Sequence, residues 1–497
     1  MKEIYTNRKC GIELPDKNPN KRPNDSIDIT IGVFFDGTGN NKYNVYFNQR
    51  AKEQFKKGYE AYIDKKGQKK YKPSKGYDSY KSGYSNVAIL WEMYDTSIPY
   101  QEKVYIEGPG TEAPVGGSRY FADEEGLSSS GKGDSVVIGE GLGMGDTGIG
   151  AKVDRAFKVI EDKVLSIYNN MNKKIIKSIT FDVFGFSRGA TESRIFARKI
   201  FVKDNPLSKK LKSCNINRAN EIEYYINFLG LFDTVASHKT RILYDSSKDE
   251  SLYIPQNVSM VVHLVAADDY RRYFPLTTVG SAYEKEKKCI EYALPGAHSD
   301  IGGGYADTEK EILYMGSKFP SQKTIHDKDS KDFRGYMSLT DLRDRQWISV
   351  SDYNKAIEYY IKKPMSLDAP CRNVKNHYAR IPLKIMHQVA LDNGLDFRVT
   401  DGTKKYQEIP PEDKELIHVA RFLMGDFFAS RKIYRINVKD WVDERGKEYK
   451  MGIDFTYGRW TDKLLKSIRR CFLHLSAAED SISNPATSTG RRVIIQG

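Results

Sequence analysis

The amino-acid sequence predicts an α/β fold in which a mostly parallel β-sheet is flanked by helices. Two observations support this class. Apolar, β-branched runs of strand length alternate with segments of helical periodicity, and polar residues follow directly on several of these runs. The carboxyl ends of parallel strands meet at one edge of a sheet, and ligands bind there. We therefore expect the functional residues in the loops that follow the strands.

The predicted strands are rich in Val, Ile and Phe. The first covers residues 27–35 and runs straight into the turn DGTGNN at residues 36–41. The others are expected at 103–111, 179–184 and 226–237, and within 259–274 and 289–305. Each is followed by Gly, Pro or polar residues, which favours one common edge that carries the loops.

The predicted helices have apolar residues at helical spacing. They are expected at residues 85–94, 151–171, 188–201 and 381–397. Ser85 or Asn86 is the expected N-cap of the first, and Gly394 closes the last. The second presents one apolar face to the sheet, made of Val153, Phe157, Ile160 and Val164.

A chain of 497 residues is longer than one core usually needs, since single hydrophobic cores stop growing at about 250–300 residues. We therefore expect additions to a central unit. A flexible lead-in is expected at 1–25, followed by an α/β core at 26–310 that contains a Lys- and Tyr-rich insertion at 42–84. A second insertion is expected at 311–376. Residues 377–497 are expected to form a helix that completes the core and a C-terminal cap or membrane-contacting lobe.

The chain is basic, with 79 Lys and Arg against 66 Asp and Glu and a formal net charge of +13. Such a charge favours anionic partners such as phospholipid headgroups or nucleic acid, although a Lys-rich solvated surface explains it equally well. Five scattered cysteines without C-x-x-C spacing argue against a disulfide framework or a metal site, and favour synthesis in a reducing cytoplasm.

The N-terminal 25 residues contain no apolar segment, so no Sec-type signal peptide is expected. No stretch approaches the roughly 18 apolar residues of a membrane span. If the protein leaves its cell, another machine must export it. The Gly-rich run at 139–150 resembles a dinucleotide-binding motif, but no strong strand precedes it. We therefore expect a loop before a helix, and no bound cofactor.

The most specific chemical signal is a G-x-S-x-G motif formed by Gly185, Ser187 and Gly189. It lies between the predicted strand at 179–184 and the predicted helix at 188–201, which is the context of a nucleophile elbow. A serine on such a tight turn needs neighbours without side chains, and its hydroxyl stands at the positive end of the helix dipole. The alternative is a Gly-flanked strand end without chemistry.

A serine nucleophile needs a histidine base and a carboxylate that orients the base. In α/β-hydrolases the chain order is Ser, then Asp or Glu, then His. Asp233 follows one predicted strand and His298 lies in a Gly-rich loop after another, so both order and placement fit. Asp268 and Asp269 follow a further strand and are rival orienters.

Two other histidine interpretations stay open. His298 has Asp300 two residues later, which suggests a metal pair, but no third ligand cluster accompanies them. A loop histidine that caps a turn is the plainer alternative for His298. His263 lies inside a predicted strand and is expected to be a buried core residue.

The oxyanion of a tetrahedral intermediate needs two backbone N–H donors. Arg188, directly after the nucleophile candidate, is the first expected donor. The second is expected from the early loop, at Gly37 or Thr38, because its glycines let the backbone approach a substrate. Asp36 and Asp300 are candidate supporting residues. An ordinary Gly/Asn turn is nearly as good an explanation of the early loop.

Several segments together resemble the type VI secretion phospholipase effectors, an α/β-hydrolase family. They are IGVFFDGTGNN, FGFSRGATESR, GLFDTVAS and PGAHSDIGGGY, with the tail segments IPLKIMHQVALDNGL and FLHLSA…GRRVI. The resemblance implies a triad of Ser187, Asp233 and His298. It also implies phospholipase A activity on bacterial membranes, delivery into a neighbour's periplasm by a secretion spike or tube protein, and a cognate immunity protein.

Two alternatives compete with an antibacterial lipase that is made in the cytoplasm and acts in the periplasm of a target bacterium. One is a soluble esterase or thioesterase without a membrane target. The other is a basic nucleic-acid-binding module, which would need basic and aromatic residues on one surface and no working triad. The order Ser187, Asp233, His298 counts against it, so no nucleic-acid partner is expected.

Overall fold

The computed structural model describes most of the chain in separate segments. They are residues 26–51, 59–63, 69–73, 79, 82–116, 127–128, 147–171, 175–236, 252–271, 274–282, 289–312, 339–362, 371–430, 439–442, 448–451, 462–476, 492 and 494–495. The expected lead-in at 1–25 and most of the Gly-rich run at 139–150 lie outside the described residues.

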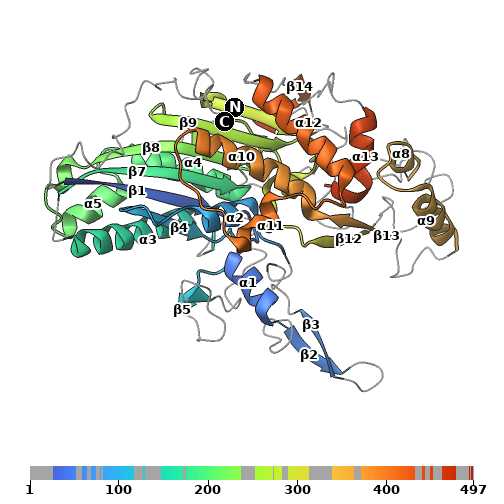
Figure 1. Ribbon diagram of the computed structural model, residues 1–497, viewed down its shortest axis with the longest axis horizontal. Helices are drawn as coiled ribbons and strands as arrows, with labels where there is room; N and C mark the ends of the chain where they lie inside the picture. The colour runs from blue at the N-terminus through green and yellow to red at the C-terminus, as the bar shows by residue number, and fades with distance from the viewer. Residues whose placement is uncertain are drawn as a thin grey trace.

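A six-stranded sheet with the order β11-β9-β8-β7-β1-β4 forms the centre of the fold, and every neighbouring pair of strands is parallel (Figure 1). The strands are β1 (Ser26–Phe35), β4 (Gln101–Ile106), β7 (Ile175–Phe186), β8 (Glu223–Phe232), β9 (Val258–Ala266) and β11 (Cys289–Leu294). The parallel sheet confirms the predicted α/β class.

Two strands end earlier than the sequence predicts. β4 ends at Ile106 where residue 111 was expected, and β8 ends at Phe232 where residue 237 was expected. After β8, Val235 and Ala236 remain buried although they lie outside the sheet. Burial of Val235 and Ala236 thus continues beyond the hydrogen-bonded ladder of β8, and sequence pattern alone does not distinguish such buried residues from a strand.

The strand order reverses next to β1. The chain leaves β1 for β4 on one side and then returns to β7 on the other side. In open parallel sheets, ligands bind in the crevice outside the carboxyl ends of the strands at such a reversal. The turn DGTGNN follows β1 and the motif GFSRG follows β7, so the topology places both motifs at this point.

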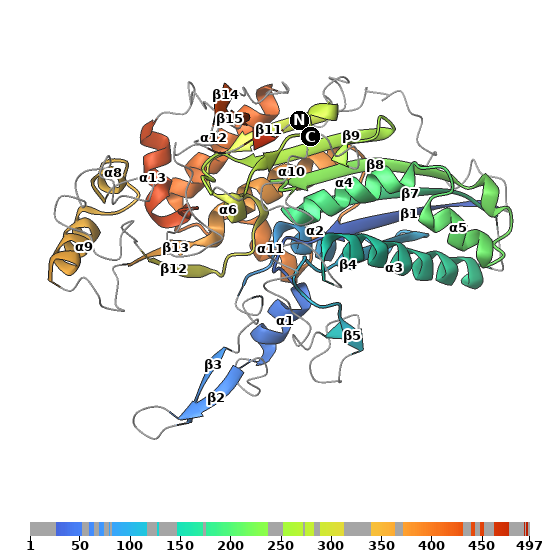
Figure 2. The same ribbon diagram turned by 180° about the vertical axis from the view of Figure 1, so that it is seen from behind.

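One face of the sheet is covered by α3 (Ile149–Asn170), α4 (Arg188–Ile200) and α5 (Pro206–Ser213), which lie in front in Figure 2. The predicted apolar face of α3 is buried here, and it packs in one core with the β1 side chains that point the same way. These β1 residues are Ile29, Ile31, Val33 and Phe35.

The opposite face is covered by α2 (Asn86–Met93), α10 (Arg380–Asp392) and α12 (Lys414–Ser430), and α13 (Asp462–Phe472) packs beside α12. Their apolar residues share a core with Phe184, Phe228 and Leu264 of the sheet. Within the segment expected as the completing helix and the C-terminal cap or lobe, α10 and α12 lie on this face of the sheet, and α13 contacts α12 and β13 (Figure 1).

Two helix ends show the expected chemistry. Ser85 is the N-cap of α2, and its Oγ accepts a hydrogen bond from the Ala88 N–H at 3.1 Å. Gly394 follows the end of α10 with a φ of 82°, a left-handed conformation that glycine adopts at little cost.

The first insertion contains α1 (Lys42–Ala51) and an antiparallel hairpin of β2 (Tyr59–Ile63) and β3 (Lys69–Pro73). In both ribbon views the hairpin projects away from the body of the molecule (Figures 1 and 2). In the second insertion, β12 (Thr308–Ile312) pairs with β13 (Cys371–Lys375), and α8 (Leu339–Asp344) and α9 (Val350–Lys362) lie between them in sequence.

The remaining elements are short. They are β5 (Val115–Gly116), β6 (Leu127–Ser128), β10 (Leu276–Thr277), β14 (Lys439–Val442), β15 (Glu448–Met451), β16 (Ile494–Ile495), α6 (His298–Gly302) and α11 (Asp401–Gln407). Within the described segments, no helix has the length and apolar content needed to cross a membrane.

Candidate active site

Ser187 occupies the turn between β7 and α4 with backbone angles of φ 58° and ψ −125°. A positive φ is uncommon for a residue with a side chain, and such strain costs on the order of 1–3 kcal/mol. It persists where the surroundings hold it in place, which is a frequent property of functional residues. The turn thus has the geometry of a nucleophile elbow.

The two glycines of the motif are required by close packing. A Cβ atom on Gly185 would lie 2.3 Å from the Oγ of Ser193, and one on Gly189 would lie 2.2 Å from the carbonyl oxygen of Asp36. Both distances are too short for any side chain. The absence of side chains therefore lets α4 start directly behind Ser187, against the loop that follows β1.

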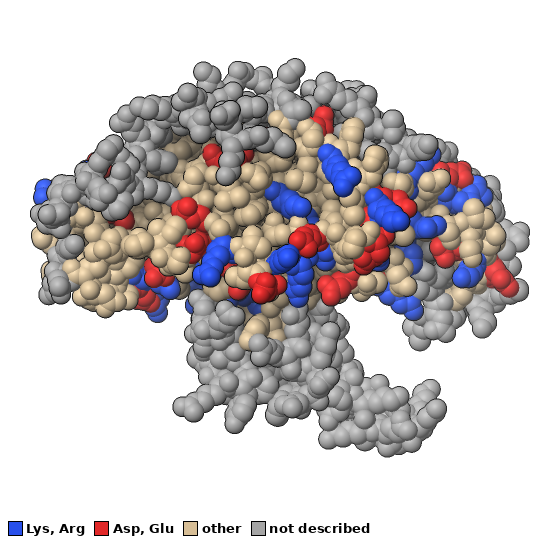
Figure 3. Space-filling model, viewed as in Figure 1, with Lys and Arg blue, Asp and Glu red and all other residues tan. Residues whose placement is uncertain are grey.

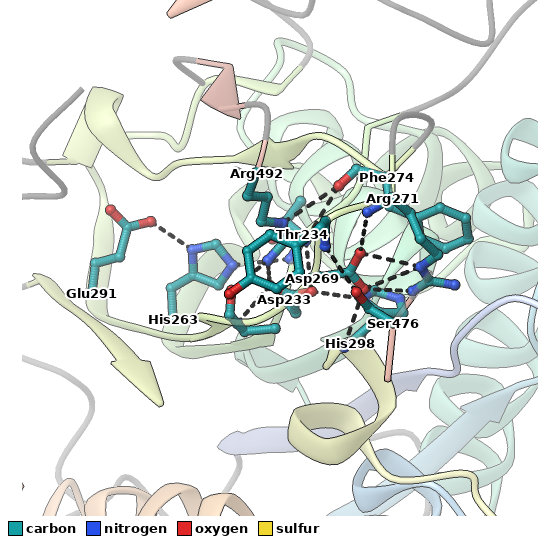
Figure 4. A network of polar contacts seen from close by, with 12 residues as sticks. Asp233, Thr234, His263, Asp269, Arg271, Phe274, Glu291, His298, Ser476 and Arg492 are labelled. Carbon is teal, nitrogen blue, oxygen red and sulfur yellow. Dashed lines mark hydrogen bonds and ion pairs between the residues drawn. The ribbon is translucent and has the colours of Figure 1, made fainter. Parts of the chain in front are cut away.

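His298 is the first residue of α6, in the loop region after β11. Its Nδ1 lies 2.5 Å from Oδ2 of Asp233, which directly follows β8 (Figure 4). The imidazole ring also packs against the ring of Phe186, with 4.6 Å between the ring centroids. Since Phe186 precedes Ser187, the histidine and its carboxylate lie beside the elbow.

The two rival carboxylates make different contacts. Asp269 accepts the backbone N–H of His298 at 3.2 Å and forms an ion pair with Arg271. Asp268 accepts the N–H of Gly296 at 2.7 Å. Both side chains therefore hold the loop that carries His298, whereas the Asp233 carboxylate contacts the imidazole itself.

Asp233 is fully buried, and besides His298 it contacts a cation, the guanidinium of Arg492. Nη1 and Nη2 of Arg492 donate to the two carboxylate oxygens of Asp233 at 2.5 and 2.8 Å (Figure 4). Burial alone would raise the pKa of Asp233, but the charges of Arg492 and His298 outweigh it and hold this pKa well below its usual range. The carboxylate is therefore ionised at neutral pH.

The pKa of His298 is lowered from 6.5 because burial disfavours the imidazolium, and the Asp233 carboxylate opposes only part of this effect. The ring is therefore mostly neutral at pH 7, which is the form that a general base needs. With its Nδ1 proton directed at Asp233, the other nitrogen, Nε2, is the one that can accept a proton.

The loop after β1 is joined to the elbow by side chains. Nε of Arg188 donates to Oγ1 of Thr38 at 2.7 Å. The Gly37 N–H donates to Oδ1 of Asp36 at 2.7 Å, and the Tyr105 hydroxyl donates to the other Asp36 oxygen at 2.6 Å. Burial raises the pKa of Asp36 to about 6 despite these hydrogen bonds.

Of the two expected loop donors, the Gly37 N–H is thus already engaged by Asp36. This arrangement favours Thr38 over Gly37 as the partner of Arg188 in an oxyanion hole. Asp36 contacts the loop through the Gly37 N–H and is joined to β4 by the Tyr105 hydroxyl.

Asp300 connects the His298 loop to the C-terminal part of the chain. Its Oδ2 accepts the N–H groups of Ala297 and His474 at 2.8 and 3.0 Å, and its Oδ1 lies 2.7 Å from Nδ1 of His474. Burial lowers the pKa of His474, but the Asp300 charge outweighs it and the net shift is upward. This pairing uses the carboxylate that the sequence suggested as half of a metal pair.

His263 is fully buried within β9, where the sequence places a core histidine. Its Nε2 accepts the N–H of Thr234 at 3.0 Å, and its Nδ1 lies 2.7 Å from Oε1 of Glu291 (Figure 4). This second buried pair fixes the backbone directly after Asp233. Among the described residues, no group of three or more His, Cys, Asp or Glu side chains has the arrangement of a metal site.

Arg492 and His474 are the contacts that sequence reasoning missed. Both lie in tail segments that were noted for their resemblance, FLHLSA and GRRVI. Arginine is well suited to buried ion pairs with carboxylates, but nothing local in the segment GRRVI identifies Asp233 as the partner of Arg492.

Comparison with protein families gives a partial match. Residues 201–326 match the model of the T6SS phospholipase effector Tle1-like catalytic domain, a range that contains Asp233 and His298 and begins after Ser187. The match confirms the resemblance to type VI secretion phospholipase effectors that the motifs predict. A search of curated proteins found no match.

One solved structure is similar to this chain over nearly its whole length. The structure titled "Structure of the Tle1 effector bound to the VgrG spike from the Type 6 secretion system" is similar over 96% of this chain and 95% of that chain, with a TM-score of 0.52 and 22% identity. At this identity the likeness concerns the fold. A crystal structure of an uncharacterized protein from Pseudomonas aeruginosa aligns with a TM-score of 0.39 and 18% identity over 81% of this chain and 51% of that one. This likeness is too weak to support a structural inference.

Proposed function

Because residues 201–326 match the catalytic domain of Tle1-like type VI secretion phospholipase effectors, we propose that this protein is a serine hydrolase that cleaves phospholipid acyl esters. The observation that carries the proposal is the contact between His298 and Asp233 beside the strained turn of Ser187. A base, its orienting carboxylate and a serine on an elbow are the parts that acyl transfer needs.

In the proposed reaction, the Ser187 hydroxyl attacks the ester carbonyl carbon while Nε2 of His298 takes the hydroxyl proton. The Asp233 carboxylate holds the Nδ1 proton and stabilises the imidazolium that forms. The backbone N–H groups of Arg188 and Thr38 donate to the oxyanion. His298 then passes its proton to the departing lysophospholipid alcohol, and a water molecule activated by the same histidine hydrolyses the acyl-enzyme.

We further propose a phospholipase A-type toxin that is exported by a type VI secretion machine and acts on membranes of a target bacterium. The similar solved protein is bound to a VgrG spike, which supports a spike protein as the loading partner here. A cognate immunity protein would protect the producing cell. The target is the periplasmic face of the membrane, which the proposed export route reaches.

The charge distribution gives little support to the nucleic-acid alternative. On the face seen in Figure 3, Lys and Arg side chains alternate with Asp and Glu side chains among the described residues. A basic stripe is the usual footprint of a nucleic-acid-binding surface. On that face, the Lys and Arg side chains of the described residues are thus not gathered into one patch.

The decisive experiment measures fatty-acid release from phospholipid vesicles by the purified protein and by Ser187→Ala. We expect the substitution to lower the rate by a factor of about 10³ or more, because the acyl-enzyme cannot form. A short-chain nitrophenyl ester is assayed in parallel. Hydrolysis of the soluble ester without release from vesicles would favour the esterase or thioesterase alternative, and a fully active Ser187→Ala protein would refute the nucleophile.

A further inference from the structure

Arg492 lies five residues from the end of the chain and is buried beside the candidate triad. Besides the two hydrogen bonds to Asp233, its Nη1 donates to the carbonyl oxygen of Ala266 at 2.9 Å. A planar guanidinium that faces a carboxylate through two parallel hydrogen bonds fixes both the position and the rotation of that carboxylate. The contact therefore bears on the group that orients His298.

The tail is held in place independently of this ion pair. β16 pairs in parallel with β10, with Ile494 opposite Leu276. The side chain of Ile494 packs against Leu276 and Val265 in a small buried cluster. β10 is in turn tied to the site, since the Thr277 N–H donates to the carbonyl oxygen of Thr234 at 2.9 Å. The strand pairing and the apolar contact thus fix the position of Arg492 beside Asp233.

We infer that Arg492 is a positioning residue for the proposed reaction: it holds the Asp233 carboxylate in the plane that His298 needs and offsets its buried negative charge. This inference rests on the proposed serine hydrolase function. It implies that a residue of the GRRVI segment completes a site whose triad candidates, Ser187, Asp233 and His298, all lie much earlier in the chain.

Four charged groups act on the imidazole of His298. The Asp233 carboxylate contacts its Nδ1, and Arg492 neutralises that carboxylate. Asp269 and Arg271 form a second ion pair next to the ring, with Asp269 on the backbone N–H of His298. Within these two ion pairs the two carboxylates and the two arginines balance in charge.

Removal of the Arg492 charge leaves this buried group with one net negative charge. A proton then binds more readily to the Asp233–His298 pair, whichever of the two residues carries it. The apparent pKa of the pair rises, so a larger fraction of the enzyme is protonated and inactive at a given pH. The acid limb of the kcat/KM profile should move to higher pH.

The test compares kcat/KM against pH for Arg492→Met, Arg492→Lys and the unchanged protein on a soluble ester. We expect the midpoint of the acid limb to rise by about 1 pH unit in Arg492→Met. Arg492→Lys keeps the charge, so its midpoint should stay near that of the unchanged protein. Its kcat should fall, because an ammonium group is a point charge and does not hold both carboxylate oxygens.

Arg194 provides a matched control. It is also fully buried, but its Nε and Nη1 donate to the carbonyl oxygens of Leu252 and Thr278 at 2.7 and 3.0 Å. Arg194→Met should therefore lower thermal stability without moving the acid limb. An Arg492→Met protein that behaves in the same way would overturn the inference, because Arg492 would then be a structural residue like Arg194.

Chemical rescue covers the case in which Arg492→Met does not fold. Arg492→Ala is prepared with added guanidinium or, at equal concentration, with urea, which has a similar planar shape and no charge. We expect guanidinium, but not urea, to restore activity and the low midpoint of the acid limb. Equal recovery with the two additives, or no recovery with either of them, would refute the role of the charge. Ser187→Ala and the unchanged protein accompany each series, so an absence of Ser187-dependent hydrolysis would refute the proposed function separately.

Discussion

The backbone N–H of Ser187 donates to the carbonyl oxygen of Phe232 at 3.0 Å, and Phe232 is the residue directly before Asp233. Asp233 in turn donates its N–H to the carbonyl oxygen of Leu264 on β9 at 2.8 Å. The ends of three neighbouring strands are therefore joined by backbone hydrogen bonds at the candidate site. A side-chain substitution at this edge tests the chemistry of one group while the sheet keeps the others in place.

Asp233→Asn is expected to lower kcat on a soluble ester by a factor of about 10²–10⁴. An amide at this position favours the wrong tautomer of His298, so Nε2 carries the proton and cannot act as a base. The amide also leaves the Arg492 charge unpaired, which should destabilise the fold by about 3–5 kcal/mol. Steady-state kinetics and thermal unfolding of the same preparation measure the two effects.

Asp268→Asn is the control for the orienting carboxylate. Asp268 is buried at a neighbouring strand end, but it holds the Gly296 N–H and the Tyr270 hydroxyl rather than the imidazole. Its substitution should therefore reduce kcat by less than tenfold, an order-of-magnitude expectation for a residue without contact to the reacting groups. If Asp268→Asn proved more damaging than Asp233→Asn, the assignment of the acid would be wrong.

The strand-to-turn pattern was sufficient to predict the sheet class and the loops that carry Ser187, Asp233 and His298. The sequence favoured Asp233 over Asp268 and Asp269, but all three residues follow strands, so only the spatial arrangement shows which carboxylate contacts the imidazole. Arg492 was beyond reach for the same reason. Its contact with Asp233 spans most of the chain, and nothing local in a short tail strand specifies which carboxylate it meets.

The pH dependence of kcat/KM should have an acid limb with a midpoint below 6.5, the ordinary pKa of histidine. Below the pKa of His298 the ring is an imidazolium and cannot take the Ser187 proton. Above it the ring is neutral and active. Because burial lowers this pKa, activity should persist as the pH falls below 7, and a profile on a soluble ester measures the midpoint.

Titration of Asp36 must be distinguished from titration of His298 as the cause of this acid limb. Burial raises the pKa of Asp36 to about 6, so this carboxyl also titrates in the same pH range. Asp36→Asn removes that titration while it keeps an oxygen that can accept the Gly37 N–H. The acid limb should remain in this variant if His298 is responsible for it. A limb that disappears with Asp36, or a midpoint above about 7, would contradict the assignment of His298 as the base.

Gly37→Ala should displace Thr38, the loop donor that follows it, and lower kcat by a factor of about 10²–10³, the scale of losing one oxyanion donor. The added Cβ would lie 2.3 Å from Cδ1 of Phe186, so either the loop after β1 or the ring against His298 must move. Gly150→Ala is the matched control, because a Cβ at that position in α3 meets nothing within 4 Å. Full activity of Gly37→Ala would exclude this loop from the oxyanion hole.

Toxicity is expected to depend on the compartment. Expression in the cytoplasm should be tolerated better than expression of the same protein with an added periplasmic signal peptide, because the proposed target is the periplasmic face of the membrane. Growth curves of the two strains measure the difference, with Ser187→Ala expressed in both compartments as the inactive control. Equal growth of the two active strains would argue against a periplasmic phospholipid target.

The projecting hairpin of β2 and β3 is the part of the first insertion that we expect to meet a membrane. Its residues 59–73 interleave cationic and aromatic side chains in sequence, namely Lys65, Lys66, Lys69, Lys70 and Lys72 with Tyr59, Tyr62 and Tyr71. Each lysine near an anionic bilayer contributes on the order of 1 kcal/mol, and tyrosine suits the headgroup level. The insertion begins directly after the loop of Gly37 and Thr38, so a docked hairpin would present that loop to lipid.

The test is co-sedimentation of Ser187→Ala protein with anionic vesicles across a salt series, with and without residues 59–73. The deletion stops short of Ser79, whose Oγ accepts a hydrogen bond from the side chain of Asn44 in α1 at 2.8 Å. Docking through the hairpin predicts that deletion weakens binding and flattens the salt dependence, because attraction between exposed charges fades within a Debye length of about 8–10 Å.

A full-length variant with the five hairpin lysines changed to glutamine should lose the salt dependence while it keeps the tyrosine contribution. The catalytically active forms of both variants should hydrolyse a soluble ester at the normal rate. Binding curves that coincide for all three proteins would show that the hairpin takes no part in docking.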